Sequence, residues 1–70
     1  MSTDEPVLGK LATVTHPITP GRPGEVIVHI RGGTETYIAY ADTELPVQAE
    51  VLVIGLRSAR TVEVTPFVGG

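Results

Sequence analysis

Residues 25–41 read EVIVHIRGGTETYIAYA, two runs of alternating apolar and polar residues on either side of a Gly-Gly pair. Successive side chains of a β-strand point to opposite faces, so this alternation predicts two strands that each bury one face. A glycine pair can adopt the positive φ angles of a two-residue turn. The sequence therefore predicts a β-hairpin with strands over 25–31 and 34–41.

The register of this hairpin determines which of its faces is buried. If Gly32 and Gly33 form the turn, two apolar pairs share one face, Val28 opposite Tyr37 and Val26 opposite Ala39. We expect these four side chains to lie in the core.

The other face of the hairpin is polar except for three side chains. The same count places Ile27 directly opposite Ile38, with Tyr40 diagonally adjacent. A contiguous apolar cluster on the surface of a small acidic domain is a candidate contact surface. We therefore expect Ile27, Ile38 and Tyr40 to bind a protein partner or a second copy of the chain.

The rest of the chain predicts three further strands and no helix. Residues 8–16 and 61–65 are rich in β-branched residues, and a proline follows each run. Residues 49–56 are almost entirely apolar, which predicts the most buried strand, covered on both sides, with Gly55 at a bulge. We expect loops over 17–24 and 42–48 and a turn over 57–60.

Five short strands in 70 residues predict a small all-β domain, a five-stranded closed barrel, because closure removes exposed sheet edges. One longer connection between the third and fourth strands favours an OB-fold-like barrel, with an SH3-like barrel as the alternative. We expect one domain over residues 7–68 after a disordered tail over residues 1–6. The chain has no cysteine, so the apolar core must stabilise this domain without disulfides.

Composition argues against a nucleic-acid-binding protein. The net charge is −3, with only five Lys and Arg residues, whereas phosphate binding depends on clustered basic residues. An OB-fold domain that binds nucleic acid remains the alternative function. It would need Tyr40 and Phe67 for base stacking and Arg31, Arg57 and Arg60 for charge. We expect weak affinity for nucleic acid or none.

The sequence also lacks the signals of a membrane-spanning or secreted protein. No apolar run approaches the roughly 18 to 20 residues of a transmembrane helix. The amino terminus is acidic, whereas a secretory signal is basic and then apolar. We expect a cytoplasmic location without direct insertion into a membrane.

No motif in the sequence is typical of an enzyme. His16 and His29 have no acidic partner or further ligand at the spacing that a general base or a zinc site requires. Neither serine lies in a Gly-x-Ser-x-Gly turn. Asp42 and Glu44 are more typical of a solvated loop than of a cation site. We expect no catalytic, cofactor or metal site and no enzymatic activity.

A spaced set of residues resembles the carboxy-terminal soluble domain of NfeD-like proteins. The set comprises Gly9-Lys10, Pro17-Ile18, Pro20, Gly24, Val26, Tyr37-x-Ala39, Leu45-Pro46 and Val62-x-Val64-x-Pro66. The resemblance extends from Leu8 to Phe67. This chain departs from the family pattern at Ala12 and Gln48, where the family usually has glycine, and in a longer loop before Gly24.

The resemblance implies an OB barrel that acts as a non-enzymatic protein–protein interaction module. Its implied partners are membrane scaffold proteins of the stomatin, prohibitin or flotillin type, which would hold the domain at the membrane surface. Long members of the family also carry a serine protease domain, but no residue here matches its catalytic serine or lysine.

Overall fold

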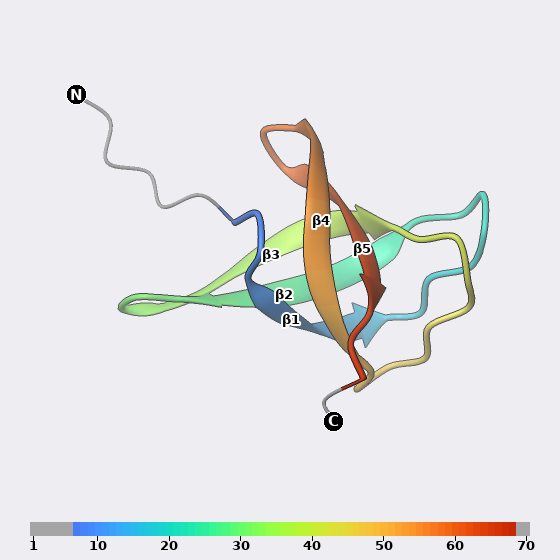
Figure 1. The fold of residues 1–70 in the computed structure, drawn as a ribbon, viewed down its shortest axis with the longest axis horizontal. Helices are drawn as coiled ribbons and strands as arrows, with labels where there is room; N and C mark the ends of the chain where they lie inside the picture. Colours follow the sequence, from blue (N-terminus) through green and yellow to red (C-terminus); the bar gives the residue numbers. More distant parts are fainter. Residues whose placement is uncertain (1–6, 69–70) are drawn as a thin grey trace.

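The structure is a computed structural model that describes residues 7–68, and the tail expected over residues 1–6 lies outside them. Its strands are β1 (Leu11–His16), β2 (Gly24–Ile30), β3 (Gly33–Tyr40), β4 (Glu50–Ser58) and β5 (Thr61–Pro66) (Figure 1). They close into a barrel in the order β1-β2-β3-β5-β4, and residues 7–68 contain no helix. The predicted all-β, OB-fold-like barrel of five strands is confirmed.

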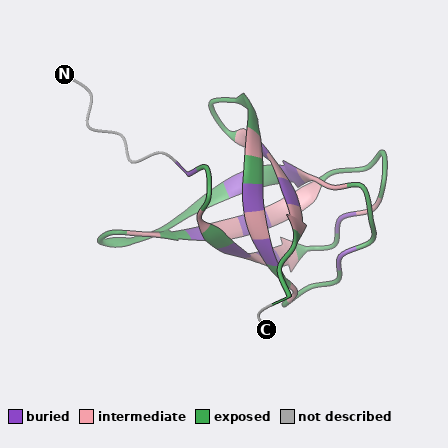
Figure 2. Cartoon of the chain, in the orientation of Figure 1, coloured by how far each residue is buried: buried purple, intermediate pink, exposed green. Residues whose placement is uncertain are grey.

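The core consists of buried residues from all five strands (Figure 2). The largest fully buried side chains are Val14, Val26, Val28, Val51, Val53 and Val62 from the strands, with Ile18 from the β1–β2 connection. Valine suits this position because its branched side chain packs well on a pleated surface. Val7 and Leu45, from segments outside the strands, complete the cluster. Burial of these apolar side chains stabilises the barrel.

The turn of the β2–β3 hairpin differs from the predicted one by one residue. Ile30 pairs with Gly33, so Arg31 and Gly32 form the turn in place of Gly32 and Gly33. Gly32 has a φ of 87°, a left-handed conformation that favours glycine, whereas Arg31 does not have a positive φ. A turn with a single left-handed residue at its second position needs only one glycine, and Arg31 takes the first position.

This turn changes the pairing of the hairpin but not its faces. Val26 lies opposite Tyr37 and Val28 opposite Glu35, so the predicted pairs of Val28 with Tyr37 and of Val26 with Ala39 are wrong. Each partner has moved by two positions, and a shift of two keeps every side chain on the same face of the sheet. The four residues predicted for the core are all buried.

The prediction that residues 49–56 form the most buried strand is wrong. β4 buries Val51 and Val53, but Ile54 is 54% and Leu56 is 53% exposed. The pairing of β4 with β5 shifts register between Val53 and Gly55, which confirms the predicted bulge. Within residues 7–68 no second layer of chain covers the outer side of β4, so Ile54, which follows the buried Val53, faces solvent, whereas Leu56 pairs with the buried Val62 and is exposed on the other face.

Candidate functional site

The candidate surface lies on the outer wall of the barrel, where β5 runs between β3 and β4. Tyr40 of β3 pairs with Glu63 of β5, which in turn pairs with Gly55 of β4. Val62 and Val64 are buried, so Glu63 between them faces outward by the alternation of a strand. The parallel pairing of β3 with β5 therefore brings Tyr40 and Glu63 together on the surface.

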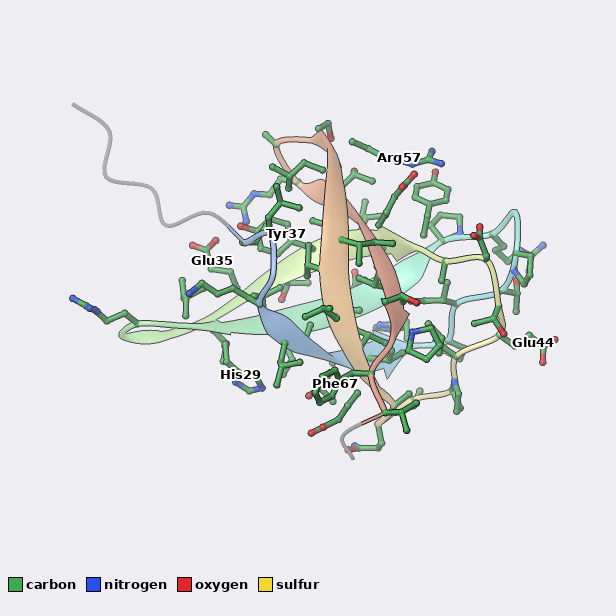
Figure 3. All side chains as sticks on the ribbon, viewed as in Figure 1. His29, Glu35, Tyr37, Glu44, Arg57 and Phe67 are labelled. Carbon is green, nitrogen blue, oxygen red and sulfur yellow. The ribbon has the colours of Figure 1, made fainter. Side chains whose placement is uncertain are left out.

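Arg57 of β4 reaches across this wall to both residues. Its Nε donates a hydrogen bond of 2.8 Å to Oε2 of Glu63. Its guanidinium carbon lies 4.1 Å from the centroid of the Tyr40 ring. Arg57 extends outward from the barrel in Figure 3. The Arg57 and Glu63 side chains are 49% and 44% exposed, so solvent screens the pair, and it contributes at most about 1 kcal/mol to stability.

A hollow of about 220 Å³ lies beside this contact. Its polar lining comes from Tyr40, Asp42, Arg57 and Glu63, and its apolar lining includes the exposed Ile54. Ile38 is on the outer face of β3, two residues before Tyr40, and is 44% exposed. We refer to Ile38, Tyr40, Ile54, Arg57 and Glu63 together as the Tyr40 surface.

The three residues predicted to bind a partner all lie on the outer faces of β2 and β3, but they do not form the predicted cluster. Ile27 pairs with Thr36 and Ile38 pairs with Glu25, so the predicted direct contact between the two isoleucines is wrong. Ile27 is half-buried, and of the three only Tyr40 lines the hollow. A role of Ile27, Ile38 and Tyr40 in binding stays a prediction.

Sequence reasoning missed the contribution of β4 and β5 to this surface. Arg57 was expected in a turn, whereas β4 continues to Ser58 and carries Arg57 on its exposed end. Only the alternation of Glu63 with two buried valines indicated an outward side chain. No local pattern signals that β5 lies parallel to β3, because that pairing joins distant segments.

The histidines do not form a metal centre. Within residues 7–68 no group of three or more His, Cys, Asp or Glu side chains could hold a metal ion. His16 does have a carboxylate partner that its spacing did not reveal, with Nδ1 3.1 Å from Oε1 of Glu25. Both side chains are solvent-exposed, so the pair lacks the enclosure of a catalytic site.

A second hollow, of about 390 Å³, lies between the β1–β2 and β3–β4 connections and is largely apolar. Ile18 and Leu45 hold the two connections together with a pair of backbone hydrogen bonds of 3.0 and 2.8 Å. Pro17, Pro46 and Val47 contribute to its walls.

The described residues also include no helix that is long and apolar enough to cross a membrane.

Sequence and fold together define the class of this protein as a small OB-fold-like barrel of the NfeD type. The NfeD C-terminal domain family matches residues 11–65, from the start of β1 to the penultimate residue of β5. The chain therefore belongs to the NfeD C-terminal domain family, and the predicted resemblance is confirmed. No relative was found among curated protein sequences.

Solved structures of other proteins share the fold. The soluble domain of the NfeD protein YuaF from Bacillus subtilis is 27% identical, with a TM-score of 0.74 over 83% of this chain and 70% of that one. The C-terminal domain of stomatin operon partner protein 1510-C from Pyrococcus horikoshii is 22% identical, with a TM-score of 0.71 over 90% of this chain and 91% of that one.

Proposed function

We propose that this domain is a non-enzymatic protein–protein interaction module that acts at the membrane surface with a scaffold protein of the stomatin, prohibitin or flotillin type. Membership of the NfeD family supports this function. The name of the Pyrococcus horikoshii relative, a stomatin operon partner protein, supports the type of partner.

The Tyr40 surface is the observation that carries the proposal. Ile38 and Ile54, which are 44% and 54% exposed, lie on the two strands that flank β5. Tyr40 and Arg57 lie on the same wall. Tyrosine is enriched among the residues that contribute most to protein interfaces, especially with apolar neighbours that exclude water. We therefore place the partner on this wall, with Ile27 at its margin.

Nucleic-acid binding is not favoured as the alternative. Arg57 is paired with Glu63, and Arg60 lies 3.8 Å from Glu35, so two of the three arginines that could meet phosphate already have acidic neighbours. Tyr37 is only 9% exposed. The guanidinium of Arg57 covers one face of the Tyr40 ring. The domain thus offers few exposed aromatic faces for base stacking and few unpaired basic side chains for phosphate, and its net charge is −3.

The test is a binding measurement between the purified domain and a purified stomatin-type protein of the same organism, reconstituted in lipid vesicles. We expect the domain to co-sediment with vesicles that carry the scaffold and not with bare vesicles. Ile38→Lys should abolish this, because it places a charge in the apolar contact. Lysine is preferred to glutamate because the cross-strand neighbour of Ile38 is Glu25, which a second carboxylate would repel.

Thr34→Lys is the matched control, since it adds the same charge to the same face of β3 outside the Tyr40 surface. Its binding should equal that of the parent. The proposal fails if the parent does not bind the scaffold, and the placement fails if Ile38→Lys binds as well as Thr34→Lys.

A further inference from the structure

We propose that the hollow beside Tyr40 binds a basic side chain, an arginine or a lysine, of the protein partner, and that Arg57 occupies this site in the free domain. The inference rests on the proposed function and specifies the chemistry that the partner presents. It also assigns Arg57 a role as an internal competitor for the site.

The first observation is that the site already holds a guanidinium. Arg57 lies with its guanidinium carbon 4.1 Å from the centroid of Tyr40, and its Nε is 2.8 Å from Oε2 of Glu63. An aromatic face together with a carboxylate is the combination that attracts a guanidinium or an ammonium group. The geometry therefore shows that these two side chains can receive a cation on the outer wall.

The second observation is the room that remains beside Arg57. The hollow measures about 220 Å³, whereas one water molecule occupies about 30 Å³ of the liquid. Asp42 lines the same hollow and adds a second carboxylate, while Ile54 offers an apolar wall for the stem of a long side chain. A lysine or arginine matches this combination of acidic and apolar lining.

Charge complementarity gives the sign of the ligand. The lining contains two carboxylates, Asp42 and Glu63, against the single guanidinium of Arg57. The whole chain carries a net charge of −3. The local and the overall charge thus attract a cation and repel an anion.

The contact of Arg57 is weak enough to exchange. Its side chain is 49% exposed and that of Glu63 is 44% exposed, and ion pairs at such positions are screened by solvent. Arg57 also lies near the exposed end of β4 on a flexible stem. A basic side chain of the partner can therefore replace it at little cost, and removal of Arg57 should improve binding.

The test is an NMR titration of the isotope-labelled domain with the peptide acetyl-Gly-Arg-Gly-amide. The matched peptide in which citrulline replaces arginine keeps the shape and removes the charge. We expect the arginine peptide to shift the Tyr40 ring and the Glu63 side-chain signals, and the citrulline peptide to bind at least about fivefold more weakly. A lysine peptide should bind, and a glutamate peptide should not.

The decisive variant is Arg57→Met, which removes the competing charge and keeps an apolar stem. It should bind the arginine peptide about threefold to fivefold more tightly than the parent does. Arg60→Met is the control, because it makes the same change in net charge while its guanidinium lies near Tyr37 and Glu35, away from the hollow. Its affinity should stay near that of the parent. Tyr40→Leu in the Arg57→Met background should abolish the gain.

Three results would overturn the proposal: weaker or unchanged binding in Arg57→Met, an equal gain in Arg60→Met, or equal affinity for the citrulline peptide. Thermal melts of each variant check that the barrel is intact, and we expect melting temperatures near that of the parent, because Arg57 and Arg60 are exposed and Tyr40 is only partly buried. The titration needs no scaffold protein. Peptide binding without scaffold binding would therefore support this cation site and reject the proposed function. Scaffold binding without peptide binding would support the proposed function and reject the cation site.

Discussion

Gly24 lies directly against the backbone carbonyl of Pro17, at the point where the loop after β1 returns to start β2. A Cβ atom built at Gly24 would overlap the carbonyl oxygens of Pro17 and His16. These atoms belong to the backbone and cannot turn aside as a side chain would. The two strands can therefore meet here only because residue 24 has no side chain.

Gly24→Ala should lower the free energy of unfolding by at least about 2 kcal/mol, because the loop or β2 must shift to make room. Urea unfolding followed by circular dichroism measures this loss. Gly55→Ala is the control within another strand, since its Cβ would meet Glu63 at an ordinary distance of 3.5 Å. A loss in Gly55→Ala as large as that in Gly24→Ala would contradict the steric explanation.

Gln48→Gly should raise the free energy of unfolding by about 0.5 to 1 kcal/mol. Gln48 is exposed and has a φ of 80°, a left-handed conformation that costs about 1 to 2 kcal/mol for a residue with a Cβ. Part of the gain is offset because glycine is more flexible in the unfolded chain. Gln48→Ala keeps the Cβ and should give no gain, and an equal gain in Gln48→Ala would show that the φ angle is not the cause.

Val26→Ala should cost about 2 kcal/mol, because Val26 is fully buried and its loss leaves a cavity in the barrel. Ile38→Ala removes more atoms, but its side chain is 44% exposed, so the cost should stay below about 1 kcal/mol. Thermal unfolding of both variants compares the two faces of the hairpin. The reverse order of the two losses would show that the faces are assigned wrongly.

Nucleic acid should bind the domain only weakly or not at all at an ionic strength of about 0.15 M, since the chain has a net charge of −3. Fluorescence anisotropy with a labelled single-stranded oligonucleotide checks this expectation. Tight binding that is lost in Arg57→Ala and Arg60→Ala would instead support the nucleic-acid alternative.

The faces of the strands could be predicted from the sequence, because burial follows the alternation of apolar and polar residues. The cross-strand partner of Val28 could not be predicted from the sequence. Both Arg31-Gly32 and Gly32-Gly33 supply a left-handed glycine for a two-residue turn, so either pair could form it. The two turns differ by two positions in register but bury the same side chains. Alternation alone is therefore unable to separate them.

Most of the Tyr40 surface could not be predicted for a different reason. Tyr40 was singled out as an outward aromatic residue, but its neighbours Glu63 and Arg57 come from strands that follow a long connection. Their position depends on the parallel pairing of β3 with β5, which no local sequence pattern predicts. The exposed Ile54 was misjudged because an apolar run does not reveal whether another layer of the protein covers it.

The family pattern contained one further signal. The resemblance to the NfeD domain predicted glycine at the position of Gln48, and the structure places this residue in the left-handed region. The departure from the predicted pattern thus falls at a position where the backbone conformation itself favours glycine.

The most direct test of the central claim, that a stomatin-type scaffold docks on the Tyr40 surface, is to map that contact by NMR. The soluble part of the scaffold would be added to the isotope-labelled domain, and the amide signals followed. We predict that the largest changes occur at Ile38, Tyr40 and Glu63 on β3 and β5. Changes centred instead on Leu11 of β1 and Leu52 of β4, or no changes at a saturating scaffold concentration, would contradict the account.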